Sequence, residues 1–281
     1  MSGFVDRDGD EGGAAMGADG NGSSDGRPAR GTGTVALVAG VLAVLALLVL
    51  VRAILAMGYL TVRFAGEIDP LSRAVSYYVF VEQGAGVFTG VLVTLALATV
   101  AILVGMIQLR IRPGARVVAL VATWCVALVL CAAFPTDDSP RVETAAGWVH
   151  QFAGASLFIT LPFAGFGLAH SLRAYPAWVE AAPLLRRLSM VAAGLALGYL
   201  ATRLPDLLFW WHFPEALDWR AVSGLVQRVL FAAELALLLV LAVHLFRTAV
   251  HTHRDTRRVR GHDSGHGTGH DTAGASAGER R

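Results

Sequence analysis

The chain has 281 residues, of which 55% are hydrophobic and only 16% are charged, and its mean hydropathy is +0.57. Soluble domains are about one-quarter charged, so this composition excludes an ordinary water-soluble protein. The formal net charge of +2 is small and gives no indication of a nucleic-acid partner.

The chain opens with a polar segment and then becomes strongly apolar. Residues 1–33 consist mainly of Gly, Asp, Ser and Ala, and such a segment cannot bury enough apolar surface to offset the entropy of ordering it. We therefore expect a disordered N-terminal tail. Residues 34–57 form a nearly unbroken apolar run. At 1.5 Å per residue, that run is long enough to cross a hydrocarbon core of about 30 Å.

Five further apolar runs follow, at residues 84–108, 117–134, 148–171, 188–204 and 222–246. A backbone amide in lipid has no water to bond, so each run is expected to be a helix that satisfies its own hydrogen bonds. The runs are continuous rather than alternating, which excludes a transmembrane β-barrel. We therefore predict an all-α polytopic bundle of six transmembrane helices over residues 34–248. Residues 249–281 are expected to form a disordered, basic tail that contains histidine.

Small residues suggest two places where these helices could approach one another closely. Gly86-x-x-x-Gly90 lies in the second run and Gly194-x-x-x-Gly198 in the fifth. The same spacing also arises by chance in a chain this rich in Gly and Ala. The motifs therefore name candidate crossing points and no more.

The arginines predict how the bundle is oriented. Thirteen arginines flank the spans on the side of the two termini, and five lie in the connections on the opposite side. Positively charged residues accumulate on the cytoplasmic side of a membrane protein. We therefore predict a multi-pass protein of the cell membrane with both termini in the cytoplasm.

Polar side chains interrupt the apolar runs at a few positions. The sixth run contains Gln227, Arg228 and Glu234, and Glu234 falls close to its middle. A charge at that depth costs about 2.5–3.5 kcal/mol on insertion scales, so it should face the bundle interior with a partner or be neutralised. Arg52 in the first run lies at a depth similar to that of Arg228.

A second polar group lies between the third and fourth runs. The segment Phe134-Pro135-Thr136-Asp137-Asp138 ends the third run, and His150 lies near the start of the fourth. The predicted topology brings these carboxylates and this imidazole to the outer mouth of the bundle. They could form a pocket for a lipid headgroup, an ion or a small solute. They could equally cap helix ends or hold helices together.

Four short motifs together resemble a known family. They are the stretch from Asp69-Pro70-Leu71-Ser72 to Val75-Ser76-Tyr77-Tyr78, the Phe134–Asp137 turn, His150, and Gln227-Arg228 at the start of the sixth run. This pattern is similar to that of the bacterial domain-of-unknown-function 998 membrane proteins, over about residues 35–248. The resemblance implies six membrane helices and no defined biochemical role. Its polar positions correspond here to Ser76, Asp137, His150 and Arg228.

These observations favour a non-enzymatic protein of the lipid bilayer that binds a lipid headgroup or a small anionic solute in an outer-facing polar pocket. We predict that the pocket is formed by Arg52, Ser76, Asp137, His150, Arg228 and Glu234. We assign no catalytic residue, no metal and no cofactor, because nothing in the sequence fixes a nucleophile or a close set of metal ligands.

Two other functions stay open at this point. A metal-assisted hydrolase of the outer leaflet would use Asp137, His150 and His212. A proton-coupled transporter would use Glu234 as a titrating carboxylate, although the sequence lacks the internal repeats that many transporters have.

Overall fold

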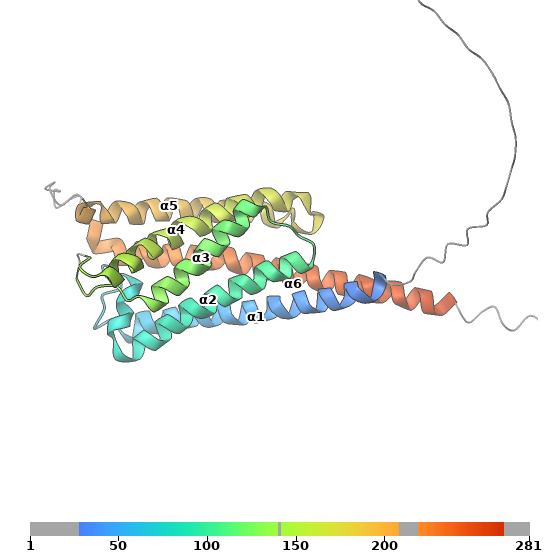
Figure 1. Cartoon of the computed structure of the whole chain (residues 1–281), viewed down its shortest axis with the longest axis horizontal. Coiled ribbons are helices and arrows are strands. Elements are labelled where there is room, and N and C mark those ends of the chain that lie inside the picture. Colours follow the sequence, from blue (N-terminus) through green and yellow to red (C-terminus); the bar gives the residue numbers. More distant parts are fainter. Residues whose placement is uncertain (1–27, 140–141, 208–218, 267–281) are drawn as a thin grey trace, which may run out of the picture.

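A computed structural model describes residues 28–139, 142–207 and 219–266 of the chain. In these residues the structure has six long helices, which run back and forth along one axis (Figure 1). They are α1 (Pro28–Arg63), α2 (Glu82–Gln108), α3 (Ala115–Ala133), α4 (Ala145–Ser171), α5 (Ala181–Leu207) and α6 (Ser223–His266). The predicted all-α fold and its six helices are therefore confirmed.

All six helices are long and apolar enough to cross a membrane. The shortest, α3, has 19 residues and a length of about 28 Å, which just matches the hydrocarbon core. Many large apolar side chains on the outside of the bundle are exposed, as expected where lipid is the solvent. The chain is a multi-pass membrane protein.

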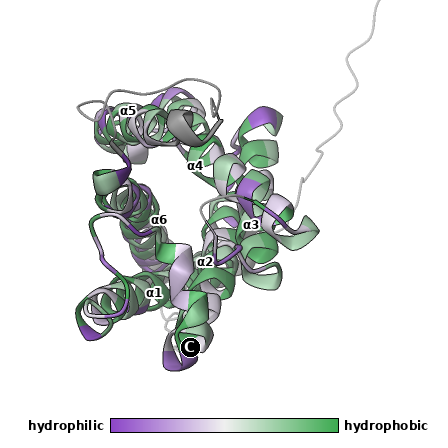
Figure 2. Cartoon of the chain, turned by 90° about the vertical axis from the view of Figure 1, so that its left-hand side faces the viewer, coloured by the Kyte–Doolittle hydropathy of each residue, from purple (hydrophilic) through white to green (hydrophobic). Residues whose placement is uncertain are grey.

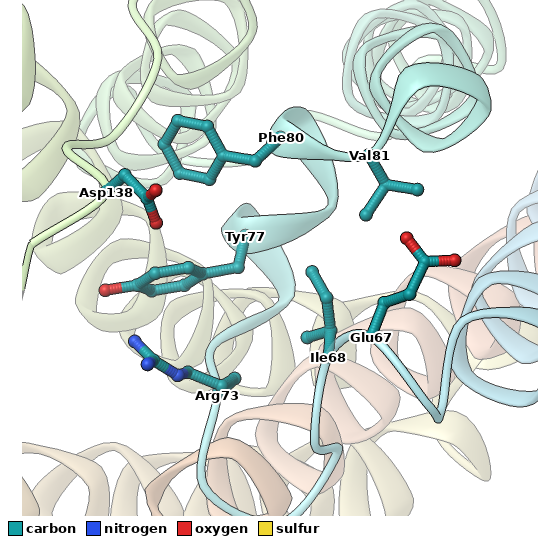
Figure 3. A pocket seen from close by; sticks show the side chains of 7 residues that line it. All are labelled: Glu67, Ile68, Arg73, Tyr77, Phe80, Val81 and Asp138. Carbon is teal, nitrogen blue, oxygen red and sulfur yellow. The ribbon is translucent and has the colours of Figure 1, made fainter.

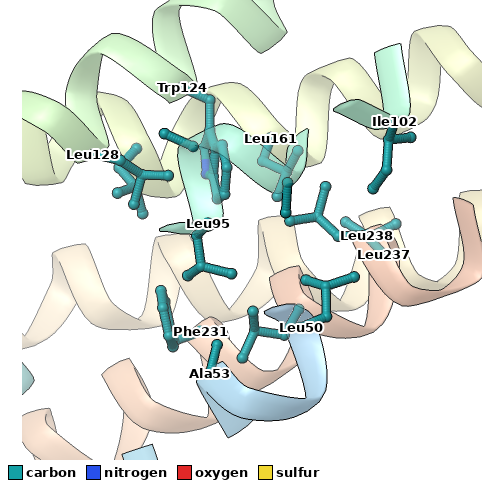
Figure 4. Close-up of a cluster of buried hydrophobic side chains, with 14 of the residues drawn as sticks. Leu50, Ala53, Leu95, Ile102, Trp124, Leu128, Leu161, Phe231, Leu237 and Leu238 are labelled. Atoms are coloured by element: carbon teal, nitrogen blue, oxygen red, sulfur yellow. The ribbon is translucent and has the colours of Figure 1, made fainter. Parts of the chain in front are cut away.

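The helices pack as neighbours in chain order, and α1 closes the arrangement by packing against α6. Figure 2 shows this order in a view along the bundle. The core between them contains Leu50, Leu95, Trp124, Leu161 and Leu238, all of which are almost completely buried (Figure 4). Each of these side chains comes from a different helix, so the core joins α1, α2, α3, α4 and α6.

Glycines do mark close helix contacts, but at positions other than those predicted. A Cβ added at Gly86 or Gly194 would meet no atom within 4 Å, and one added at Gly90 or Gly198 would lie only 3.9 Å from Arg52 or 4.0 Å from Val226, so neither candidate forms a tight crossing. At three other glycines an added Cβ would lie too close to a side chain of a neighbouring helix, so the helices do approach closely there. These pairs are Gly105 with Leu245, Gly165 with Ser189, and Gly167 with Val117.

The helices α1 and α6 extend beyond the segment 34–248 that hydropathy indicated. The α1 helix begins at Pro28, and α6 continues to His266 through residues that we expected in a tail. The two extensions pack together, as the 3.3 Å distance between Nδ1 of His253 and the carbonyl of Gly33 shows. The remaining parts of both expected tails, residues 1–27 and 267–281, lie outside the described residues.

The connections lie at two ends of the bundle. We call the end that holds residues 64–81, 134–139 and 142–144 the distal end, and the end that holds residues 109–114 and 172–180 the proximal end. The start of α1 and the last turns of α6 lie beyond the proximal end, on the right of Figure 1.

Candidate functional site

The connection between α1 and α2 is a folded segment, which we call the distal segment (residues 64–81). It contains a carboxylate-capped turn, in which Asp69 accepts hydrogen bonds from the amide of Leu71 at 3.1 Å and from the amide of Ser72 at 3.3 Å. The Ser72 hydroxyl also donates to this carboxylate, at 2.5 Å. The Ser72 hydroxyl and the Leu71 amide lower the pKa of Asp69. A short helix, η1 (Val75–Phe80), then leads into α2.

The first turns of α6 hold the distal segment in place. The side-chain oxygen of Gln227 accepts a hydrogen bond from the amide of Val75 at 2.8 Å, and the hydroxyl of Ser223 donates to the carbonyl of Ser72 at 2.9 Å. Gly224 lies directly against the backbone of Arg73. These contacts join residues that are about 150 positions apart in the sequence.

Arg228 completes this attachment. Its Nη1 atom donates to the carbonyls of Pro70 and Arg73, both at 2.7 Å, and to the carbonyl of Gly224 at 3.1 Å. Its Nη2 atom donates to the hydroxyl of Tyr78 at 3.0 Å. The terminal nitrogens of this guanidinium therefore bind protein acceptors. Arg228 fixes the shape of the distal segment.

Asp137 plays a similar part in the connection between α3 and α4. Its carboxylate accepts hydrogen bonds from the Thr144 hydroxyl at 2.6 Å, from the Glu143 amide at 2.8 Å and from the Thr144 amide at 3.2 Å. These donors, above all the Thr144 hydroxyl, lower the pKa of Asp137. Thr144 in turn caps the start of α4 by accepting from the amide of Gly147 at 3.0 Å.

The other predicted pocket residues lie in separate surroundings. The His150 ring is buried, with Nδ1 2.8 Å from the carbonyl of Phe134. Arg52 is exposed on α1 and donates to the hydroxyl of Thr94 on α2 at 3.4 Å. Ser76 is buried in η1, and Glu234 is buried in α6 with no hydrogen-bond partner.

Among the residues that the structure describes, no hydrogen bond joins any two of the six, so a single pocket that they all line stays a prediction. The metal-site alternative also gains no ligand set. Within the described ranges, no group of three or more His, Cys, Asp or Glu side chains lies together, and His212 falls outside those ranges.

A hollow of about 240 Å³ does open at the distal end, beside the predicted residues (Figure 3). We call it the distal hollow. It is lined by Glu67, Ile68, Arg73, Tyr77, Phe80, Val81 and Asp138. The charged side chains among these are exposed. Because three of its seven lining residues are charged, the hollow is polar. It lies where the distal segment meets the connection between α3 and α4.

Two aromatic rings shape one side of the distal hollow. The centroids of Tyr77 and Phe80 are 5.9 Å apart in an edge-to-face arrangement, and the Arg73 guanidinium carbon lies 5.0 Å from the Tyr77 centroid. Tyr77 also donates to the carbonyl of Ser139 at 3.4 Å. One cation, two carboxylates and a π-surface thus belong to the lining of one hollow.

A family model described as "Protein of unknown function (DUF998)" matches residues 44–244. The chain belongs to the DUF998 family. The match runs from α1 to α6 and includes the distal segment, so the resemblance that the short motifs indicated is confirmed. No curated protein and no solved structure shows significant similarity to this DUF998 chain.

Sequence reasoning missed two groups of residues in this DUF998 chain. Glu67 and Arg73 line the distal hollow, but the sequence does not say that the distal segment folds back on itself. Trp124 is fully buried in the middle of α3, and its indole N–H has no hydrogen-bond partner. Tryptophan is enriched at membrane interfaces, so its place inside an apolar run was a signal that could have singled it out.

Proposed function

We propose that this DUF998 protein binds the headgroup of a membrane lipid in the distal hollow, and that the headgroup is zwitterionic, with a phosphate and an ammonium group. The observation that carries the proposal is that Arg73, Glu67 and Asp138 line one hollow together with the Tyr77 ring. The proposal needs no catalytic residue and no metal.

The level of the hollow supports a lipid ligand. Six of its seven lining residues lie between the end of α1 at Arg63 and the start of α2 at Glu82, and the seventh, Asp138, lies shortly after the end of α3 at Ala133. Residues just beyond the ends of membrane spans lie in the interfacial layer, where headgroups are found. A headgroup can therefore enter the hollow from the side while its acyl chains stay in the bilayer.

The charges favour a zwitterion over a simple anion. A guanidinium such as that of Arg73 suits a phosphate, which it can bind with two parallel hydrogen bonds. The carboxylates of Glu67 and Asp138 would repel an anionic solute but attract an ammonium group. The Phe80 ring and the face of Tyr77 that Arg73 does not cover add a surface that also favours a cation. The ligand that satisfies all of these groups carries both signs of charge.

The residues that sequence analysis singled out support this hollow from outside. Arg228 binds the carbonyl of Arg73, and Asp137 holds the connection that carries Asp138. Groups held in place before binding lose less entropy when the ligand arrives. We infer that the family's polar motifs position the binding residues and do not themselves contact the ligand.

The test is lipid retention by the full chain in nanodiscs that contain equal amounts of phosphatidylethanolamine and phosphatidylglycerol, measured by native mass spectrometry. We expect the wild-type chain to retain phosphatidylethanolamine. Arg73→Gln should weaken retention about tenfold or more, since a hydrogen bond to a charged group contributes about 1.5–3 kcal/mol.

Arg112→Gln is the matched control, because Arg112 is also exposed but lies at the proximal end. Asp138→Asn should shift the preference toward phosphatidylglycerol, because it removes a negative charge from the hollow. Equal retention of both lipids by the wild type, or no change in Arg73→Gln, would contradict the proposal.

A further inference from the structure

A second site lies deep in the bundle, away from the distal hollow, at Glu234. This side chain is completely buried, and neither oxygen of its carboxyl group has a hydrogen-bond partner. It lies eleven residues after Ser223, the first residue of α6, which corresponds to about 16 Å along the helix axis. Glu234 is therefore near the middle of a hydrocarbon core that is about 30 Å thick.

The surroundings of Glu234 are apolar with one exception. Leu230, Phe231 and Leu238, which lie within one turn of it on α6, are buried. The indole N–H of Trp124 on α3 faces the carboxyl group, but the two do not reach hydrogen-bonding geometry. Figure 4 shows Trp124 among the apolar side chains of the core.

No charged side chain in the described ranges interacts with Glu234. The charged and titratable groups on the helices around it, and on α6 itself, have other partners or lie near helix ends. They include Arg52 on α1 with Thr94, Glu82 exposed at the start of α2, Cys125 and Cys131 on α3 with the carbonyls of Ala96 and His150, His150 on α4 with the carbonyl of Phe134, Arg186 and Arg187 exposed near the start of α5, and on α6 Arg228 with the distal segment and His244 with the carbonyl of Val240.

An unpaired carboxylate at this place is not tolerated, because burying a bare charge in an apolar medium costs many kcal/mol. We propose that Glu234 is a proton-binding site in the membrane interior whose proton exchanges with water. Binding forms one O–H bond on a carboxyl oxygen and removes the single negative charge, and the proton comes from and returns to water.

A proton fits this site better than a metal cation does. Cations such as Na⁺, Ca²⁺ or Mg²⁺ need several oxygen ligands, whereas the group that faces Glu234 is an N–H donor. An N–H donor suits the carbonyl oxygen of a protonated carboxyl group. The described residues also contain no cluster of ligand side chains around Glu234.

Proton exchange would involve other polar groups that lie at a similar depth in the bundle. The Thr160 hydroxyl on α4 is also buried without a partner. A Cβ at Gly165 on α4 would lie 3.4 Å from Leu237 on α6, so the two helices are in contact at this level. Thr160 lies five residues before Gly165 and Glu234 lies three residues before Leu237, so the two polar residues are at similar depths in the bundle. Pro162 lacks an N–H and so leaves a backbone carbonyl of α4 without its helical partner. Polar groups from α3, α4 and α6 therefore lie at a similar depth in an otherwise apolar interior.

The test is infrared spectroscopy of the full chain in lipid bilayers at neutral pH, where a protonated carboxyl group gives a separate C=O stretching band. We expect this band in the wild type, with a shift to lower frequency after transfer to D₂O. Glu234→Gln should lose the band completely, and Glu234→Asp should move it. Glu82→Gln, which changes an exposed carboxyl group on α2, should leave the band unchanged.

Absence of the band in the wild type, or its persistence in Glu234→Gln, would overturn the assignment to Glu234. A band that disappears in Glu234→Gln but never shifts in D₂O would overturn the exchange. If Glu234→Gln fails to fold, the shift in Glu234→Asp decides the same question. None of these readouts depends on lipid retention, so this proposal and the headgroup proposal can fail separately.

Discussion

At the scale of single residues, Arg228 illustrates how a membrane protein keeps a cation near the end of a span. Its guanidinium meets three backbone carbonyls and the hydroxyl of Tyr78, and it is half-buried. Carbonyls of an irregular segment have no partners of their own, and a donor with several N–H groups in a fixed fork can satisfy several at once. The cation and the irregular backbone stabilise each other.

Replacing Arg228 by Met should therefore destabilise the protein markedly. We expect the free energy of unfolding to fall by at least about 2 kcal/mol, because a hydrogen bond to a charged group contributes about 1.5–3 kcal/mol. The measurement is thermal unfolding of the purified chain in detergent micelles. Arg187→Met, at an exposed position of α5, should leave the unfolding temperature nearly unchanged. Equal unfolding temperatures for the two variants would rule out the fixing role of Arg228.

The sequence allowed the polar residues to be predicted, but not what they do. Arg228 and Asp137 stand out because charge inside or beside an apolar run is costly. Their partners are backbone groups of Pro70, Arg73 and Glu143, and no pattern of side chains indicates where a backbone carbonyl or amide will point. Glu234 was predicted to need a partner or neutralisation, and the structure provides no charged partner in the described ranges.

At the scale of helices, hydropathy predicted how many spans there are better than where each helix ends. All six apolar runs became helices, but the fifth helix begins at Ala181, seven positions before the expected start at residue 188. A helix does not stop where lipid stops, because its backbone hydrogen bonds are equally satisfied in the interface. Hydropathy measures the part of a helix that lies in hydrocarbon, and polar flanks such as Arg186 and Arg187 extend it.

The contact between α6 and the distal segment can be tested at Gly224. An added Cβ there would lie 2.9 Å from backbone atoms of Arg73, which cannot move as a side chain can. We expect Gly224→Ala to lower the free energy of unfolding by about 1–3 kcal/mol, the usual cost of overpacking.

Gly194→Ala is the matched control. No atom lies within 4 Å of its added Cβ, so it should raise stability by about 0.5–1 kcal/mol through the helix preference of alanine. Chemical denaturation in mixed micelles measures both variants. A neutral Gly224→Ala would show that α6 does not hold the distal segment through this contact.

At the scale of the whole molecule, the orientation of the bundle follows from the arginines and stays a prediction. It can be tested with single cysteines in a chain whose Cys125 and Cys131 are replaced by Ala. A cysteine at Glu82 near the distal end should react with a membrane-impermeant maleimide added to intact cells. A cysteine at Arg112 near the proximal end should react only after the cells are opened. The reverse pattern would place the distal hollow in the cytoplasmic leaflet.

The long α6 helix has a consequence for anything that is attached to its far end. It has 44 residues, and the part after residue 246 extends about 30 Å past the apolar run. The start of α1 packs against this part as far as Thr256, so a pair of helices, not a single one, extends from this end of the bundle. A domain joined to the end of α6 would be held away from the lipid surface. Any rotation of α6 within the bilayer would then rotate that domain about the axis of α6.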